Sequence, residues 1–230
     1  MTTNKLPPGQ RAIASFPRFG LLEFASRFPD AAADNCIKIG GDVGRHVSIG
    51  ADIARLARVE QTSDFHCVTT WSSLGLKWGG YRFADFYHQL IVPLAAPPAD
   101  ATFVVLRGRD GGHISLPLED LLEPDVMLAD QLNGVQLTVE HGGPLRIIAP
   151  ALYGYKNIKF ISALEFWRTG EQYRPYGPRF MGHPRARVWL EERGQWVPGW
   201  LLRYLYRPLI GATIKYFERA LARHVARSDV

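Results

Sequence analysis

The sequence predicts an α+β domain in which short strands and short helices share one hydrophobic core. Three observations lead to this prediction. The 230 residues are 47% hydrophobic and 21% charged, the balance of a globular chain long enough to bury a sizeable core. The β-like runs are short and lie between Gly, Pro and Asp turn signals. The helical patterns near them are few and about two turns long, which argues against alternating βαβ units.

Five runs are predicted as strands because β-branched and other apolar residues gather in them between turn residues. Two further segments show short helical spacing. Near the end of the sequence, apolar residues recur every three or four positions and predict one face of a C-terminal amphipathic helix. The strands are Cys36–Ile39, Phe65–Thr70, Thr102–Leu106, Leu145–Ala149 and Ile158–Leu164, the helices are Ile49–Leu56 and Phe83–Ile91, and the helix face is Ile210, Ile214, Phe217, Leu221 and Val225.

The chain shows no internal repeat, no low-complexity segment and no Ser/Gly linker, so we expect a single domain. The one compositional break lies near Arg168. From there to the end, 12 Lys and Arg stand against 5 Asp and Glu, a net +7, whereas the whole chain carries 27 against 22, a net +5. We therefore expect a core over residues 1–170 and a basic C-terminal extension over residues 171–230, packed on the core or on a membrane or partner surface.

Several classes of protein are excluded because the sequence lacks the short motifs that define them. Two cysteines, Cys36 and Cys67, cannot form a disulfide framework, an iron–sulfur cluster or a Cys-rich zinc site. A haem attachment motif and a flavin fingerprint are also missing from the sequence. The first twenty residues contain neither the apolar core of a secretory signal nor a twin-arginine pair, so a cytoplasmic location is expected. Peripheral membrane contact through the basic extension is an open alternative.

Cys67 lies in the run DFHCVTTWSS, which is expected to be a strand leading into a Ser/Gly loop. A thiolate at such a place could be a nucleophile or a ligand for a soft metal. Taken alone, an inert core cysteine is the more common case. His66 precedes the thiol, but neighbouring residues of a strand point to opposite faces, so the two do not form an easy catalytic pair.

A second block, HGGPLRIIAPALYGYKNIKF, places His141, Arg146, Lys156 and Lys159 around two glycine turns. Glycines allow the backbone to approach a ligand closely, while arginine and lysine contact phosphate. The block therefore favours an anion site. The alternative is a pair of hairpins whose cations face solvent.

Taken together, HCVTTWS and, about seventy residues later, EHGGPLRIIAPALYGYKNIKFISALEF resemble the sulfite oxidase-like molybdopterin-binding oxidoreductases. This family includes sulfite oxidases and the bacterial protein-methionine-sulfoxide reductase catalytic subunit. The resemblance covers residues 16–170. It implies the sulfite oxidase-type fold of mixed β-sheets with short helices, and a mononuclear molybdenum bound by molybdopterin and by one protein thiolate. By position that thiolate is Cys67, with His66 beside it in the cofactor site.

The resemblance also implies a cradle for the phosphate of molybdopterin. The turns HGxPxR and GYKxIK of the family become His141, Arg146, Asn157, Ile158 and Lys159 in this sequence. Side-chain cations and turn amides would both serve such a phosphate. The block FPRFGLLEF resembles the entry segment of the family, so Arg18 is the matching candidate there.

Two departures from sulfite oxidases bear on the substrate. Ser72 stands about where those enzymes carry an arginine for the anionic substrate, and Asp130 or a neighbour replaces a substrate-side tyrosine. An oxyanion without a paired cation would lose hydration at high cost. We therefore expect a small oxo compound or a sulfoxide rather than sulfite. Trp71 could wall the substrate pocket, although aromatic residues after a core strand usually serve packing.

The resemblance thus implies a molybdenum-dependent oxidoreductase that transfers an oxygen atom between the metal and a small substrate. Its electrons would pass through a separate redox partner, such as a cytochrome or a quinone-linked subunit, because the chain carries no second redox motif. The alternative is a pterin-carrying or lipid- or protein-docking module of the same fold without catalysis. No nucleic-acid partner is expected, because no binding motif for it is present.

The basic C-terminal segment allows three interpretations. Its helix could complete the core with its arginines in water, it could lie on anionic lipid, or it could dock a redox partner. The cations Lys215, Arg219, Arg223 and Arg227 run along a different face from the apolar residues, which is compatible with all three.

Overall fold

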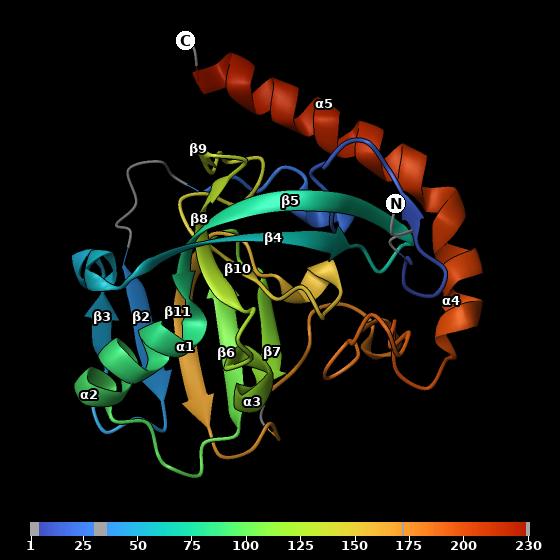
Figure 1. Cartoon of the computed structure of the whole chain (residues 1–230). Coiled ribbons are helices and arrows are strands. Elements are labelled where there is room, and N and C mark those ends of the chain that lie inside the picture. Colours follow the sequence, from blue (N-terminus) through green and yellow to red (C-terminus); the bar gives the residue numbers. More distant parts are fainter. Residues whose placement is uncertain (1–4, 30–35, 172, 229–230) are drawn as a thin grey trace.

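The computed structural model describes residues 5–29, 36–171 and 173–228, and two β-sheets carry the fold (Figure 1). In the six-stranded sheet, β5 pairs with β4 along one edge and with β1 and β8 along the other. The first residues of β5 therefore meet the N-terminal segment of the chain. The strands of this sheet are β1 (Arg11–Ala12), β4 (Arg58–His66), β5 (Trp71–Arg82), β8 (Met127–Leu132), β9 (Val135–Gln136) and β10 (Arg146–Ile148).

The second sheet has five strands in the order β3-β2-β11-β6-β7. It is mixed, because β11 runs parallel to β2 and antiparallel to β6. Leu164 and Phe166 on β11 are fully buried, which fixes the face that this strand turns to the core. The strands of this sheet are β2 (Ile37–Gly41), β3 (Val47–Ile49), β6 (Phe103–Gly108), β7 (His113–Pro117) and β11 (Ile161–Trp167).

The larger hydrophobic core joins both sheets to a helical segment over residues 83–95. Phe83, Phe86 and Ile91 of this segment are fully buried. Figure 1 shows its helices beside the second sheet. The predicted helix Phe83–Ile91 is confirmed and continues four residues further. The segment consists of α1 (Phe83–Phe86), a wider turn (Tyr87–Ile91) and α2 (Val92–Ala95).

The region around Cys67 differs from the prediction. The strand expected over Phe65–Thr70 ends at His66, and residues 67–70 form a tight turn in which the Thr70 N–H donates to the Cys67 carbonyl over 3.1 Å. Thr70 has a φ of 87°, a conformation that no residue pattern signals for threonine. The following Ser- and Gly-rich run, expected to be a loop, is the twelve-residue strand β5.

The other expected strands are confirmed with shifted ends. The α-helix predicted over Ile49–Leu56 is wrong. Ile49 ends β3, and the helical part is a 3₁₀ turn over Ala51–Arg55. The strand expected over Ile158–Leu164 begins at Ile161, after a 3₁₀ turn at Gly154–Lys156. The runs Cys36–Ile39, Thr102–Leu106 and Leu145–Ala149 are confirmed as β2, β6 and β10.

The C-terminal helices form a continuous arm over residues 199–228, called the C-terminal arm below. Leu202, Tyr206 and Phe217 are its buried side chains, so they define its inward side, and the expected amphipathic helix is confirmed. No helix within the described ranges is long and apolar enough to span a membrane. The arm comprises α4 (Gly199–Tyr206), a 3₁₀ turn (Arg207–Leu209) and α5 (Ile210–Ser228); the remaining short helices are Leu22–Phe24, α3 (Leu118–Leu121) and Arg179–Met181.

Candidate functional site

One cavity of about 450 Å³ opens between segments that lie far apart in the sequence. Five of the eight predicted site residues line it, namely Arg18, Cys67, Asn157, Ile158 and Lys159. The other three, His66, His141 and Arg146, do not line it. The walls come from residues 16–24, 65–71, 103–115, 154–160 and 170–184, with Gln195, Tyr206 and Phe217 added by the C-terminal extension.

The Cys67 turn is held in place by its backbone. The Cys67 N–H donates to the Trp71 carbonyl over 2.8 Å, and the Cys67 carbonyl accepts from the Thr70 N–H and from Nε2 of Gln10, over 3.1 and 3.0 Å. The thiol itself contacts the Thr69 hydroxyl at 3.2 Å. Both backbone groups of Cys67 are therefore engaged, and its side chain is oriented on the cavity wall by a preformed turn.

A buried hydrogen-bonded chain lies behind this turn. Nδ1 of His66 is 2.8 Å from the Ser72 hydroxyl, which donates to Oε1 of Gln10 over 3.0 Å. Because Gln10 also donates to Cys67, the chain links His66 to the carbonyl of the thiol residue. His66 thus supports the turn from behind. Burial lowers the pKa of His66, which favours the neutral imidazole for this role.

Arg193 fastens the same turn from the C-terminal extension. Its fully buried guanidinium donates to the Val68 carbonyl over 2.5 Å and to the Pro8 carbonyl over 2.9 Å. Nε of Arg193 donates to Glu191, whose carboxylate compensates the buried charge. The extension therefore completes the wall that carries the thiol.

The electrostatics at Cys67 favour the thiol when no metal is bound. Burial raises the pKa of Cys67, while the Thr69 hydrogen bonds and the charges of Arg193 and Lys159 lower it. Binding a metal through sulfur would therefore release a proton from this residue.

Lys159 supplies a cation to the cavity. Burial, followed by the charges of Arg146 and Arg18, lowers the pKa of Lys159 to about 7, and Asp110 and Glu140 oppose this shift. Its ammonium donates no hydrogen bond to any residue that the structure describes. An anionic ligand would supply both the missing acceptor and the missing charge.

Neighbouring residues on the same wall differ in how they are engaged. The Lys156 ammonium donates to the carbonyls of Ser115 and Pro184, over 2.7 and 2.8 Å. The Asn157 N–H donates to Gly154 within the turn, so it is not the amide donor that the sequence indicated. The N–H groups of Ile158 and Lys159 have no acceptor among the residues with described positions, which leaves both as backbone donors at this wall.

Arg146 and His141 lie behind the wall. The fully buried Arg146 guanidinium donates to the carbonyls of His141 and Asn157, over 2.8 and 3.3 Å, while its Nε has no partner in the described part of the chain. The His141 ring stacks on Phe16 at 4.9 Å. Burial, then Arg146 and Lys159, lowers the pKa of His141 to about 4. Both residues therefore shape the turns rather than face the cavity.

Arg18 lines the cavity, but its guanidinium is engaged. It donates to the carbonyls of Phe24, Ala25 and Arg27 and lies 5.2 Å from the ring of Phe217. Its role in this geometry is to tie the N-terminal segment to the C-terminal arm. This contact was not predictable from the sequence, because Arg18 and Phe217 are about two hundred residues apart.

The positions that bear on the substrate are also placed by the fold. Ser72 is fully buried and does not line the cavity, so a side chain there has no direct access to a substrate. Asp130 pairs with Arg58 at 2.8 Å, also away from the cavity lining. Trp71 both packs against Phe65 and lines the cavity, so the two expectations for it hold together.

Several functional residues were missed by the sequence analysis. Gln10, Asp110 and Arg193 carry no motif, and their roles arise from contacts across long sequence separations. The segment 173–184 was placed in the basic extension and was not assigned to the cavity that it lines. Its many Gly, Pro and Tyr residues were the available signal, since such composition suits a binding loop as well as a linker.

A single buried thiol on one wall and a cation with an unengaged amide on another define a site for an anionic cofactor that also carries a thiophilic metal. The sequence comparisons agree with this class. Residues 26–173 match the oxidoreductase molybdopterin binding domain, and the chain therefore belongs to this family of molybdopterin-dependent oxidoreductases. The family, the enzyme class and the molybdopterin cofactor expected from the sequence are confirmed.

Relatives differ in how much of their length this chain spans. Over 195 residues it is 32% identical to the uncharacterized oxidoreductase YuiH of Bacillus subtilis, covering 84% of this chain and 94% of that protein. It is 25% identical to the protein-methionine-sulfoxide reductase catalytic subunit MsrP of Campylobacter jejuni, covering 60% of this chain and 52% of the relative.

The fold has a solved counterpart in the sulfane dehydrogenase SoxCD of Paracoccus pantotrophus. The TM-score is 0.50 at 22% sequence identity, over 67% of this chain and 44% of that one. The sulfite oxidase-type fold expected from the sequence is thus confirmed. The chain spans about half the length of MsrP and somewhat less of SoxCD.

Proposed function

We propose that this oxidoreductase transfers an oxygen atom at a mononuclear molybdenum ligated by Cys67, and that its substrate is a sulfoxide or another small neutral oxo compound. The observation that carries the proposal is that one cavity joins the Cys67 thiol to the Lys159 wall. A thiolate suits a metal that already has sulfur ligands. A lysine suits a phosphate.

The residues present fit molybdopterin. The cavity of about 450 Å³ lies within the range of roughly 300–1,000 Å³ that is usual for cofactor sites. Lys159 and the Ile158 N–H are donors without an acceptor in the described structure, and they stand on a different wall from Cys67. When bound, the cofactor supplies the two-electron redox chemistry of the metal. The protein orients the thiol through the Cys67 turn and neutralises the phosphate through Lys159.

The neutral substrate is supported by the state of the cations. Arg18 and Lys156 line the cavity, but they already donate to backbone carbonyls. Lys159 is assigned to the cofactor phosphate. An anion such as sulfite would have to enter without a free cation, which is costly in a buried site. A neutral sulfoxide needs only a hydrogen-bond donor for its oxygen.

The electron balance requires a partner. Reducing a sulfoxide to a sulfide takes two electrons and two protons and releases one water. We propose that a cytochrome or quinone-linked subunit supplies the electrons. The name of the Campylobacter relative, a catalytic subunit, supports a separate partner of this kind.

The test is metal and pterin analysis of the purified protein beside Cys67→Ser, with turnover measured on sulfoxides and on sulfite using artificial electron carriers. We expect about one molybdenum per wild-type chain. Cys67→Ser should keep the fold. Its turnover should fall by more than about 100-fold, because losing a group that only supports a metal ligand already lowers activity by up to about 100-fold. Thermal unfolding of both proteins serves as the control for folding.

Two outcomes would contradict the proposal. Wild-type turnover retained in Cys67→Ser would remove the thiolate from the chemistry. Full molybdenum and pterin content without turnover on any oxo substrate would favour the alternative, a pterin-carrying module without catalysis. A faster reaction with sulfite than with sulfoxides would leave the enzyme class intact and overturn the substrate.

A further inference from the structure

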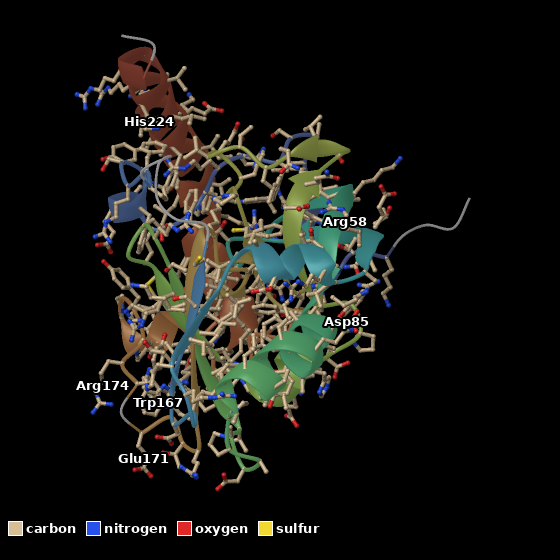
Figure 2. The ribbon with its side chains drawn as sticks, turned by 90° about the vertical axis from the view of Figure 1, so that its left-hand side faces the viewer. Arg58, Asp85, Trp167, Glu171, Arg174 and His224 are labelled. Atoms are coloured by element: carbon tan, nitrogen blue, oxygen red, sulfur yellow. The ribbon has the colours of Figure 1, made fainter. Side chains whose placement is uncertain are left out.

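We propose that the outward side of the C-terminal arm docks the protein on a bilayer that contains anionic phospholipids. The inference concerns the surface opposite Leu202, Tyr206 and Phe217, the three buried residues of the arm. It does not depend on the reaction at the cavity. In both views, the C-terminal half of α5 lies at the edge of the molecule, and Figure 2 places His224 far from Trp167 and Glu171 (Figures 1 and 2).

The first part of the arm presents a large apolar surface. Trp200, Tyr204, Leu205 and Leu209 are each more than half exposed, at 55%, 59%, 59% and 57%. They follow one another at intervals of four, one and four positions, and their exposure shows that they face away from the core. Trp196, just before the arm, is 76% exposed. A contiguous apolar surface of this kind indicates an interaction site rather than ordinary surface composition.

The second part of the arm is cationic and solvent-exposed. Lys215, Arg219, Arg223 and Arg227 are exposed, and Glu218 is the single acid between residues 210 and 228. None of the four cations forms an ion pair within the described ranges. Unlike Arg203, which pairs with Glu191 at 3.1 Å, they have no carboxylate to satisfy them. The stripe is therefore complementary to a negatively charged surface.

A cleft beside α5 adds a place for a phosphate group. Its volume is about 350 Å³, and Arg219, Arg223 and Arg227 line it together with Phe28 and Ser26. Arginine forks suit phosphate oxygens, while the Phe28 ring is stacked on His224 at 3.9 Å and borders the cleft. A phospholipid headgroup offers such a phosphate.

Lipid fits this surface better than the other classes of partner. Tryptophan and tyrosine favour the headgroup level of a bilayer, while leucines enter the boundary of the acyl chains. Nucleic acid would use the cations but gives Leu205 and Leu209 no role. A second copy would bring two cationic stripes together, which costs free energy. An interfacial helix with adjoining basic residues explains both halves of the arm.

The test is flotation of the full-length protein with vesicles of phosphatidylcholine, with and without phosphatidylglycerol, at low and high salt. Point variants are preferable to truncation, because Tyr206 and Phe217 line the cavity and their removal would open the core. We expect binding to the anionic vesicles, weak binding to the neutral ones, and release by salt.

Two pairs of variants separate the halves of the arm. Arg219→Gln with Arg223→Gln should lower the partition coefficient by at least about tenfold, since each basic residue near such a surface contributes roughly 1 kcal/mol. Leu205→Ser with Leu209→Ser should also weaken binding. The matched controls are Lys38→Gln with Lys77→Gln for charge and Val135→Ser for exposed apolar surface. Circular dichroism of all variants checks folding.

Several results would overturn the inference. These are recovery of the wild type in the soluble fraction with anionic vesicles, an equal loss of binding in the control variants, and a dimer in light scattering that the leucine variants abolish. Binding that appears only when a membrane protein is added would assign the surface to that protein instead.

Discussion

The two ends of the cavity are built on different principles. At the Cys67 end, both backbone groups of Cys67 are bonded, and Arg193 and Gln10 fasten the turn from two distant parts of the chain. At the Lys159 end, a cation and the Ile158 amide have no acceptor among the described residues. At one end the charged group, Arg193, is paired with Glu191 and bonded to the backbone, whereas at the other the charge of Lys159 has no partner among the described residues.

This difference indicates how the protein divides its work. A metal ligand must be oriented before binding, because small displacements of such a group cost much affinity. A phosphate contact tolerates adjustment, because a lysine is a flexible point charge. Changes at the Cys67 end should therefore act through geometry, and changes at the Lys159 end should act through charge and pH.

Among changes outside Cys67, the largest effect is expected for Arg193→Met, which removes the donor to the partly buried Val68 carbonyl. Molybdenum content or turnover should fall by about 10- to 100-fold, as for other groups that orient metal ligands. Metal analysis and kinetics measure this. Arg193→Lys should restore part of the loss, because a lysine can still reach one carbonyl.

Arg203→Met is the control for that variant, because Arg203 contacts Glu191 without contacting the turn. An equal loss in Arg203→Met would mean that the Cys67 end depends on the general stability of the extension and not on its own hydrogen bonds.

A smaller effect is expected for Lys159→Met, which removes the unengaged cation. Pterin retention after gel filtration should fall by about tenfold, since a charge-assisted hydrogen bond contributes roughly 1.5–3 kcal/mol. Lys77→Met on β5, an exposed position, is the matched control. Retention that is unchanged in Lys159→Met would show that the Lys159 end does not hold the phosphate.

The pH dependence of stability should separate the two ends further. Burial lowers the pKa values of Lys159 and Lys156 to about 7 in the folded protein, below the ordinary lysine pKa of 10.5. Between pH 7 and about 8.5 the unfolded chain therefore binds more protons than the folded one, and the free energy of unfolding should rise with pH. Denaturant unfolding of the cofactor-free protein measures this rise.

The cofactor should flatten that dependence, because a bound phosphate raises the pKa of Lys159 toward its ordinary value. Lys159→Met should reduce the slope in the cofactor-free protein, whereas Lys77→Met should not. A free energy of unfolding that falls over this pH range would contradict the lowered pKa values of the two lysines.

The smallest effect on the chemistry is expected for Ser72→Ala. This change breaks the hydrogen bonds to His66 and Gln10 and should cost about 1–3 kcal/mol of stability. The ratio of sulfoxide to sulfite turnover should stay the same, because Ser72 does not line the cavity. A changed ratio would give this position the role in substrate choice that the sequence indicated.

The strands that the sequence predicted share one property: β-branched residues gather in them between turn residues, as in β2 and β6. β5 was missed because its Ser and Gly residues read as a loop. In the fold, those small residues allow close pairing, since a Cβ on Gly80 would lie 2.0 Å from the Leu128 carbonyl oxygen. Sheet neighbours, not local propensity, make this segment a strand.

Site prediction followed the same division. Cys67, Asn157, Ile158 and Lys159 belong to contiguous motifs, and all four line the cavity. Arg146 belongs to such a motif as well, but its side chain turns to the carbonyls behind the wall. A sequence motif predicts which residues lie near one another in the fold. The direction in which each side chain points depends on how the neighbouring segments pack against it.

The sequence by itself determined the family and the cofactor class, because motifs of particular residue types at short spacing carry them, and Cys67 of one such motif lines the cavity. Only the tertiary structure decided which cationic side chains lack a hydrogen-bond acceptor and which ones hold the Cys67 turn in place. The physical reason is distance along the chain: Arg193 meets Val68 across 125 positions and Gln10 meets Cys67 across 57. Contacts of that range form only when the sheets and the C-terminal extension have packed, so no local pattern contains them.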